Sequence, residues 1–198
     1  MKIACLNTAC LVAAMALAPA GYANAAPYKV LPGSTLGFSS SFQGEAFEGN
    51  FAKFTPRIDF DPGKAAGAFD VAIELASTGT KNEERDEALR GSDFFNSKKT
   101  PQARYAATKF RALGGNRFAA DGTLTLNGIS KPVVLEFSWT PGAQAVLAGT
   151  ATVKRLDFKV GMGDWSDTGD LPNEVKVKTR LLLAPAATAP GTPAAKKP

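Results

Sequence analysis

The stretch "ADGTLTLNGISKPVVLEF", residues 120–137, holds two runs of alternating apolar and polar side chains joined by Asn127-Gly128. A period of two is typical of a β-strand with one buried face. Both residues of an Asn-Gly pair accept the positive φ that a type I′ turn requires. The stretch therefore predicts an antiparallel hairpin, and its apolar face carries Leu124, Leu126, Val133, Leu135 and Phe137.

The same alternation recurs from Tyr28 to Leu183, and glycine, proline and asparagine residues separate the runs at short intervals. Consecutive hairpins of this kind form either a sandwich or a closed barrel. The sequence thus predicts an all-β domain of about eight antiparallel strands. The expected strands are 36–42, 45–51, 54–60, 68–76, 104–113, 117–126, 132–139 and 145–154, with a closing strand near 174–183.

One segment interrupts the strand pattern. "TKNEERDEALRG", residues 80–91, has a Thr80-x-x-Glu83 capping box, strong helix formers and Gly91 as a stop, so it predicts a single short helix. Phe94 and Phe95 follow the helix, where they are placed to plug one end of a barrel. A second irregular stretch, residues 157–173, is rich in glycine and predicts a loop near the last strand.

The first 25 residues are typical of a cleaved signal peptide. They combine Lys2, an apolar run and a small-x-small cleavage pattern that ends at Ala25. We therefore expect an exported, periplasmic protein whose mature chain begins at Ala26. Both cysteines, Cys5 and Cys10, lie in this leader, and the chain has no histidine. The expected mature chain therefore contains neither cysteine nor histidine. This absence excludes Ser-His-Asp and Cys-His catalysis, and it excludes metal sites built on cysteine or histidine.

The charge is mildly positive, with 23 basic and 18 acidic residues and a net charge of +5. These charges form no block of one sign, so a mixed solvated surface is favoured over nucleic-acid binding. Residues 185–198 are rich in alanine and proline and predict a disordered tail. The expected folded domain therefore spans residues 26–184.

Six motifs occur in order along this domain, and together they resemble the YceI-like family of lipocalin-like, polyisoprenoid-binding periplasmic proteins. The motifs are "FEGNF" (47–51), "IDFDP" (58–62), "RDEAL" (85–89), "SDFF" (92–95), "GTLTLNGISKPV" (122–133) and "RLDFKVGMGDW" (155–165). The resemblance implies an extended antiparallel β-barrel with a helix near one end and a long apolar cavity for an isoprenoid or similar lipid. One position departs from the family, because Lys159 stands where many relatives have glycine.

An eight-stranded barrel is either filled by its own side chains or able to hold one ligand, and the alternation pattern does not separate these outcomes. The resemblance implies the second outcome. Burial of a long prenyl chain would then supply binding free energy at roughly 25 cal/mol per Å². The candidate cavity residues are Phe38, Phe42, Phe60, Phe69, Val71, Ile73, Phe94, Phe95, Phe110, Phe118, Leu124, Leu126, Val133, Leu135 and Phe137.

Five further residues of these motifs have two readings each. Arg85 and Asp86, and likewise Arg155 and Asp157, either hold the helix and loops to the barrel or meet a polar head group. An arginine beside a phosphate would be chemically suitable. Trp165 is expected to act as a lid or rim residue, with partner contact as the alternative.

We expect a binding protein without catalytic residues, cofactor or metal, whose ligand is an isoprenoid lipid or a quinone. The alternative is a quinone-binding accessory partner of a membrane b-type cytochrome. The acidic groups at 83–87 and 164–170 offer carboxylates for hydrolysis or calcium binding, but no hydrolase motif accompanies them and their spacing misses the EF-hand pattern. A monomer and a homodimer are both compatible with the sequence.

Overall fold

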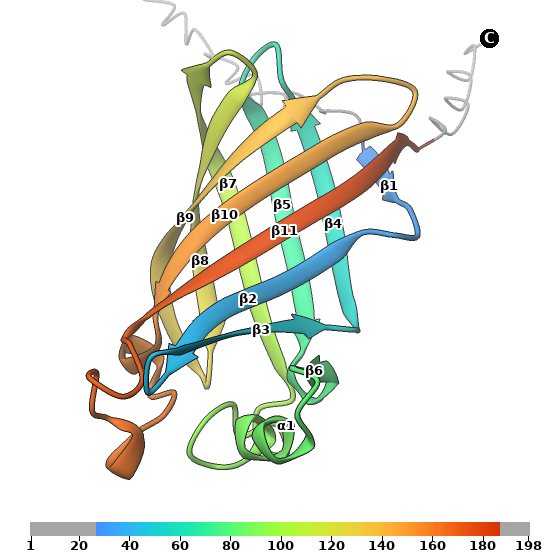
Figure 1. The fold of residues 1–198 in the computed structure, drawn as a ribbon. Helices are drawn as coiled ribbons and strands as arrows, with labels where there is room; N and C mark the ends of the chain where they lie inside the picture. Colours follow the sequence, from blue (N-terminus) through green and yellow to red (C-terminus); the bar gives the residue numbers. More distant parts are fainter. Residues whose placement is uncertain (1–26, 187–198) are drawn as a thin grey trace, which may run out of the picture.

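The computed structural model describes residues 27–186, so the expected signal peptide lies outside the described residues, as does the expected tail beyond residue 186. Figure 1 shows a single curved sheet that forms a barrel, with α1 (Glu83–Arg90), the one α-helix among the described residues, below one end. None of the helices in residues 27–186 is long and apolar enough to cross a bilayer.

Every strand pairing is antiparallel. Three short 3₁₀ turns, Leu75–Ser77, Arg155–Phe158 and Gly163–Trp165, lie between strands. The strands are β1 (Pro27–Val30), β2 (Thr35–Phe42), β3 (Glu45–Phe51), β4 (Phe54–Asp61), β5 (Ala66–Glu74), β6 (Thr78–Gly79), β7 (Gln102–Gly114), β8 (Arg117–Leu126), β9 (Ile129–Thr140), β10 (Ala145–Lys154) and β11 (Glu174–Pro185).

The predicted eight-stranded antiparallel barrel is confirmed, but its membership differs from the expected set: β1 is part of the ring, whereas β2 and β3 are not. The closed ring runs β1-β4-β5-β7-β8-β9-β10-β11 and is sealed where β1 pairs with β11. β1 and β2 pair one after the other with the same edge of β11. In β1, Val30 is paired with Leu183, and in β2, Thr35 is paired with Arg180. The sequence did not reveal β1, because 4 residues are too few to show alternation. The β2–β3 hairpin, expected inside the ring, instead extends the wall beyond it towards α1.

The hairpin at the centre of the sequence has the predicted turn. Asn127 and Gly128 have φ values of 51° and 74°, and Leu126 pairs with Ile129 across the turn. The asparagine side chain also reaches out of the turn. Its Nδ2 donates to the carbonyls of Phe94 (2.8 Å) and Phe158 (3.2 Å), so this turn ties the hairpin to the loops at the α1 end of the barrel.

The predicted helix is present, but it begins at Glu83 and not directly after Thr80, so its cap differs from the expected capping box. Asn82 is the N-cap, and its Oδ1 accepts a hydrogen bond from the Arg85 amide at 2.9 Å. Thr80 lies too far upstream to cap. Its amide and its hydroxyl both donate to Asp86 Oδ1 at 2.7 Å, which fastens the helix to the chain that enters it.

The end of the barrel away from α1 is solid. Phe60 is almost fully buried, and its ring centroid lies 5.0 Å from that of Phe118 and 5.2 Å from those of Phe110 and Phe137. Phe118 is near the start of β8, at the opposite end of that strand from Asn127. This aromatic cluster, which also includes Phe69 and Trp139, fills the end of the barrel away from α1, and the cavity lies between it and α1.

Candidate functional site

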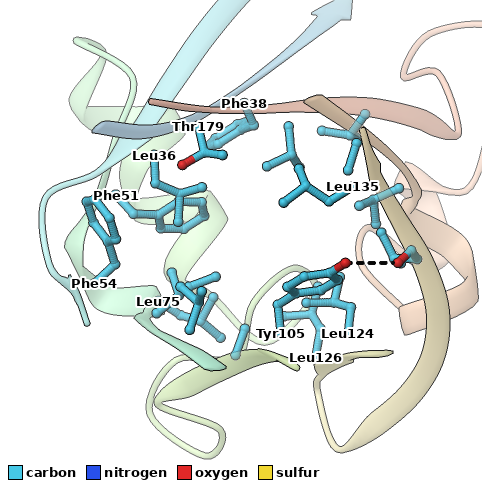
Figure 2. A pocket seen from close by; sticks show the side chains of 18 of the residues that line it. Leu36, Phe38, Phe51, Phe54, Leu75, Tyr105, Leu124, Leu126, Leu135 and Thr179 are labelled. Carbon is cyan, nitrogen blue, oxygen red and sulfur yellow. Dashed lines mark hydrogen bonds between the residues drawn. The ribbon is translucent and has the colours of Figure 1, made fainter. Parts of the chain in front are cut away.

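An apolar cavity lies between the aromatic cluster and α1. Its volume, measured to the centre of a water-sized sphere, is about 190 Å³. Figure 2 shows the side chains of Leu36, Phe38, Leu124 and Leu135 arranged around this central space. The wall is drawn from nearly every strand of the barrel, so the cavity is a product of closure and not of any one hairpin.

Most of the predicted lining residues are on this wall. Phe94 and Phe95, which follow α1, are buried at the helix end, and the Phe95 ring lies 5.9 Å from that of Phe51. They therefore occupy the plugging position that the sequence suggested. The predicted residues that line the cavity are Phe38, Phe69, Val71, Ile73, Phe94, Phe95, Leu124, Leu126, Val133 and Leu135.

The other predicted residues do not line the cavity. Phe60, Phe110, Phe118 and Phe137 belong to the aromatic cluster, where they pack against one another. Phe42 is at the rim, 38% exposed, with its ring 5.8 Å from that of Trp165. Alternation identifies the inward face of a strand, but it gives no information about height along the barrel axis. The position of a residue along this axis decides whether its inward side chain packs against others in the aromatic cluster or borders the cavity.

Many wall residues were absent from the sequence-based set. They come mainly from β2, β3, β10 and β11, whose alternation was visible but from which the sequence-based set took only Phe38 and Phe42. Tyr105 is the one large polar residue among them. The additional lining residues include Leu36, Ser40, Phe47, Phe51, Phe54, Leu75, Leu89, Tyr105, Leu147, Val153, Val160, Leu171, Val175, Val177, Thr179 and Leu181.

Glycines on the inner face help to keep the barrel hollow. A Cβ at Gly122 would collide with the ring of Tyr105, and a Cβ at Gly49 would collide with the ring of Phe38. Each aromatic ring therefore lies against a neighbouring strand and does not reach across the middle. The Tyr105 hydroxyl donates to the carbonyl of Ala120 at 2.9 Å, and burial raises the pKa of this phenol.

Arg155 is buried, at 3% exposure, and it is the one charged residue on the cavity wall. A guanidinium has five N–H donors. All of them are directed to backbone carbonyls: Nε to Pro172, Nη1 to Val160 and Gly161, and Nη2 to Trp165 and Leu171, at 2.6–3.1 Å. Burial lowers its pKa. Of the two readings, this geometry matches the structural one, because no donor is left for a head group.

The remaining motif residues surround the helix end. The Arg85 guanidinium lies 4.5 Å from the centre of the Phe47 ring, a cation–π contact on the outside of the cavity. Asp86 accepts the two hydrogen bonds from Thr80, and Asp157 is exposed. Trp165 lies between Phe42 and Phe94, with ring distances of 5.8 and 5.4 Å, which is a rim position.

The acidic residues of the two clusters do not assemble into a metal centre in the part of the chain that the structure describes. No group of three or more carboxylate, cysteine or histidine side chains converges there. Glu83, Glu84 and Asp86 instead occupy the first turn of α1, where negative charge is favoured by the helix dipole.

Comparison with known proteins identifies the family. The profile of the YceI-like domain matches residues 28–183, which is nearly the whole described chain. The chain belongs to the YceI-like family. Its relatives include the UPF0312 proteins of Photorhabdus laumondii, 33% identical over 81% of this chain and 91% of the relative, and of Pseudomonas syringae pv. tomato, 32% identical over 83% and 93%.

Solved structures agree with this YceI-like assignment. BcnA of Burkholderia cenocepacia superposes with a TM-score of 0.72 at 32% identity, covering 75% of this chain and 95% of BcnA. A polyisoprenoid-binding domain from Saccharophagus degradans, described as implicated in plant cell wall breakdown, has a TM-score of 0.63 over 82% of this chain and 99% of that domain. At 16% identity the second likeness extends to the fold alone.

The departure at Lys159 has a local explanation. Lys159 ends the Arg155–Phe158 turn with φ 56° and ψ 35°, in the left-handed region. Glycine adopts this conformation without a Cβ penalty, whereas lysine adopts it at some cost. The loop of this YceI-like protein therefore keeps the shape for which a glycine is suited, with lysine in its place.

Proposed function

We propose that this protein binds a long-chain isoprenoid or similar amphiphilic lipid in the barrel cavity and transports, stores or sequesters it without catalysis. The observation that carries this proposal is the wall itself, which is built almost entirely from aliphatic and aromatic side chains around an open space. Apolar pockets with few polar groups are typical of lipid and cofactor sites.

The size of the cavity supports the proposal. A water molecule needs roughly 10–15 Å³ of space measured in this way, and ordinary cores contain few voids larger than that. At roughly 24 cal/mol per Å³, leaving about 190 Å³ empty would cost about 4–5 kcal/mol of stability. Water is a poor filling because the wall offers few hydrogen-bond partners. An apolar guest removes this cost and gains about 0.8 kcal/mol for each CH₂ that it buries.

The fold likeness is compatible with this ligand class, since the Saccharophagus domain with the same fold is described as binding polyisoprenoids. A quinone with an isoprenoid tail is one member of the class. Delivery of such a quinone to a membrane b-type cytochrome remains the alternative function. We further propose that the protein acts in the periplasm after removal of residues 1–25, which amino-terminal sequencing of the protein from a periplasmic fraction would test.

Mass spectrometry of a solvent extract tests the ligand. The full-length gene product is purified from its native compartment without denaturant, and the extract is compared with that of a protein of similar size purified in parallel. We expect a long-chain isoprenoid in near-stoichiometric amount, and an ultraviolet quinone spectrum in the extract would favour the alternative. A delipidated protein that fails to bind any prenol or prenylquinone would contradict the proposal.

A further inference from the structure

The polar atoms on the cavity wall are few, and all but one have partners within the described chain. Thr179 donates its hydroxyl to the Thr35 carbonyl at 3.2 Å. The Tyr105 hydroxyl donates to the Ala120 carbonyl, and every N–H of the Arg155 guanidinium donates to a backbone carbonyl. The exception is Ser40, whose Oγ is buried and forms no hydrogen bond.

Ser40 faces the cavity because it continues the inward face of β2. Leu36 and Phe38 precede it on the same face and line the same space, and Ser39 points to the opposite side. Across the hairpin Ser40 pairs with Phe47, whose ring is covered by the Arg85 guanidinium. Ser40 is therefore at the helix end of the cavity, opposite the aromatic cluster. Its Oγ is covered in this rotamer, so a hydrogen bond to a ligand requires rotation of the side chain.

A buried hydroxyl without a partner destabilises the protein that carries it, because it has lost its hydrogen bonds to water and gained none. A serine hydroxyl both donates and accepts, so one ligand oxygen within reach satisfies it. A carbonyl or hydroxyl oxygen at the end of a lipid tail suits a single neutral group of this kind.

A phosphorylated lipid does not fit this end of the cavity. Burial of a phosphate requires several donors or cations. Among the described residues that line the cavity, Arg155 is the one cation, and it has no donor left. Arg85 lies over the Phe47 ring and does not line the cavity. One hydroxyl cannot replace the hydration shell of a doubly charged group.

We propose that Ser40 Oγ hydrogen-bonds the oxygen of an uncharged isoprenoid, a prenol or prenylquinone, at the helix end of the cavity. The apolar tail of this ligand extends from there towards Phe69, which lines the cavity and belongs to the aromatic cluster. This inference rests on the proposed function, because it names the polar end of the lipid that the cavity binds. It adds selection for uncharged over phosphorylated lipids.

Competition binding to the delipidated full-length protein tests the inference. Three probes share the same twenty-carbon branched tail: geranylgeraniol, geranylgeranyl diphosphate and the hydrocarbon phytane. Each displaces a fluorescent fatty acid from wild-type protein, from Ser40→Ala, and from the matched control Ser39→Ala on the outer face of β2. We expect wild type to prefer geranylgeraniol over the other two. Ser40→Ala is expected to weaken geranylgeraniol about five- to tenfold and to leave phytane unchanged.

Stability gives a second readout. Ligand-free Ser40→Ala is expected to melt at or above the wild-type temperature, because the substitution removes an unsatisfied buried hydroxyl, and Ser39→Ala is expected to match wild type in both assays. Ser40→Thr keeps a hydroxyl and retains the preference for geranylgeraniol, whereas Ser40→Cys loses it. If Ser40→Ala does not fold, these two variants still show whether the hydroxyl at position 40 contributes to the preference for geranylgeraniol.

The inference is overturned if wild type binds the diphosphate most tightly, if Ser40→Ala weakens all three probes equally, or if it changes none of them. If wild type binds none of the three probes, the proposed lipid-binding function fails as well. That result is distinct from binding without a contribution from Ser40.

Discussion

Asn127 Nδ2 donates a hydrogen bond to the carbonyl oxygen of Phe94 at 2.8 Å, so the turn of the β8–β9 hairpin holds the segment that plugs the cavity. The same side chain binds the Phe158 carbonyl, and its Oδ1 accepts from the Thr100 hydroxyl at 3.1 Å. A residue that the local sequence selects for a turn conformation thus also fixes the segment that plugs the helix end of the barrel.

Replacing Asn127 with glycine separates these two roles. Glycine accepts the positive φ of the turn, so the hairpin is expected to persist while three hydrogen bonds are lost. At about 0.5–1.5 kcal/mol each, their loss should lower the free energy of unfolding by about 1.5–4.5 kcal/mol. Bound lipid should also dissociate faster, because the plug loosens.

The matched control is Asn116→Gly, which changes an asparagine of similar φ (59°) in the β7–β8 turn at the other end of the barrel. Denaturant unfolding and stopped-flow lipid release would compare the two variants. Equal effects of both substitutions on lipid release would refute a role for Asn127 in closing the cavity.

Phe69 is expected to limit the length of the bound tail. Its ring lines the cavity and lies 4.8 Å from that of Phe110 and 5.4 Å from that of Phe137, so it separates the open space from the solid end. Phe69→Ala should extend the cavity and shift binding towards longer prenols, at a cost of about 3–5 kcal/mol in stability.

Phe118→Ala serves as the control for this prediction, because Phe118 belongs to the same cluster without lining the cavity. It should lower the melting temperature by a similar amount and leave the chain-length preference unchanged. Binding titrations with prenols of increasing length measure the preference. An unchanged optimum in Phe69→Ala would show that another residue limits the tail.

Arg155 is predicted to stabilise the loops at the helix end and not to recognise a head group. Arg155→Lys keeps the positive charge but cannot reproduce a planar fork directed at five carbonyls. Because each buried carbonyl left without a donor costs about 1–3 kcal/mol, we expect a loss of at least 3 kcal/mol and a lower melting temperature.

Arg180→Lys, on the exposed face of β11, is the corresponding control and should leave stability unchanged. Thermal unfolding followed by circular dichroism measures both variants. If Arg155→Lys kept wild-type stability and lost affinity for lipid, Arg155 would have to contact the ligand after all.

Acid sensitivity should depend on two arginine–aspartate pairs on the outer surface. The hydrogen-bonded guanidinium of Arg104 lowers the pKa of Asp70 from its usual 3.8, and Arg111 does the same for Asp121. A carboxyl whose pKa is lower in the folded state stabilises the protein above the unfolded value, and this contribution is lost as the pH falls through the folded value. Asp70→Asn should therefore be less stable than wild type at pH 7, and the difference should shrink as the pH falls below 3.8.

Asp59→Asn should behave in the opposite way. Burial raises the pKa of Asp59, and one of its carboxylate oxygens is buried without a hydrogen bond. A raised folded pKa gives stability that is present below the unfolded value and lost as the pH rises. The asparagine variant should then be more stable than wild type at neutral pH, with the difference disappearing in acid. Urea midpoints measured between pH 3 and 7 would reveal the two trends or their absence.

The sequence by itself determined most of the strands, the Asn127-Gly128 turn, the end of α1 and the family. Each of these depends on neighbours in the chain: alternation follows from the pleat, the turn from the φ preferences of two residues, and the helix end from Gly91. The cap was misassigned to Thr80: in the structure Asn82 caps the helix, and the Thr80 hydroxyl donates to Asp86 instead.

The tertiary structure alone decided where the barrel is filled and where it is hollow. Phe118 and Leu124 lie on inward-facing parts of the same strand, yet one packs in the aromatic cluster and the other lines the cavity. The same applies to Ser40 and Arg155, whose hydrogen-bonding state depends on which strands and loops converge around them after closure. Local sequence sets the direction of a side chain, but the atoms that it meets across the barrel come from residues distant in the chain.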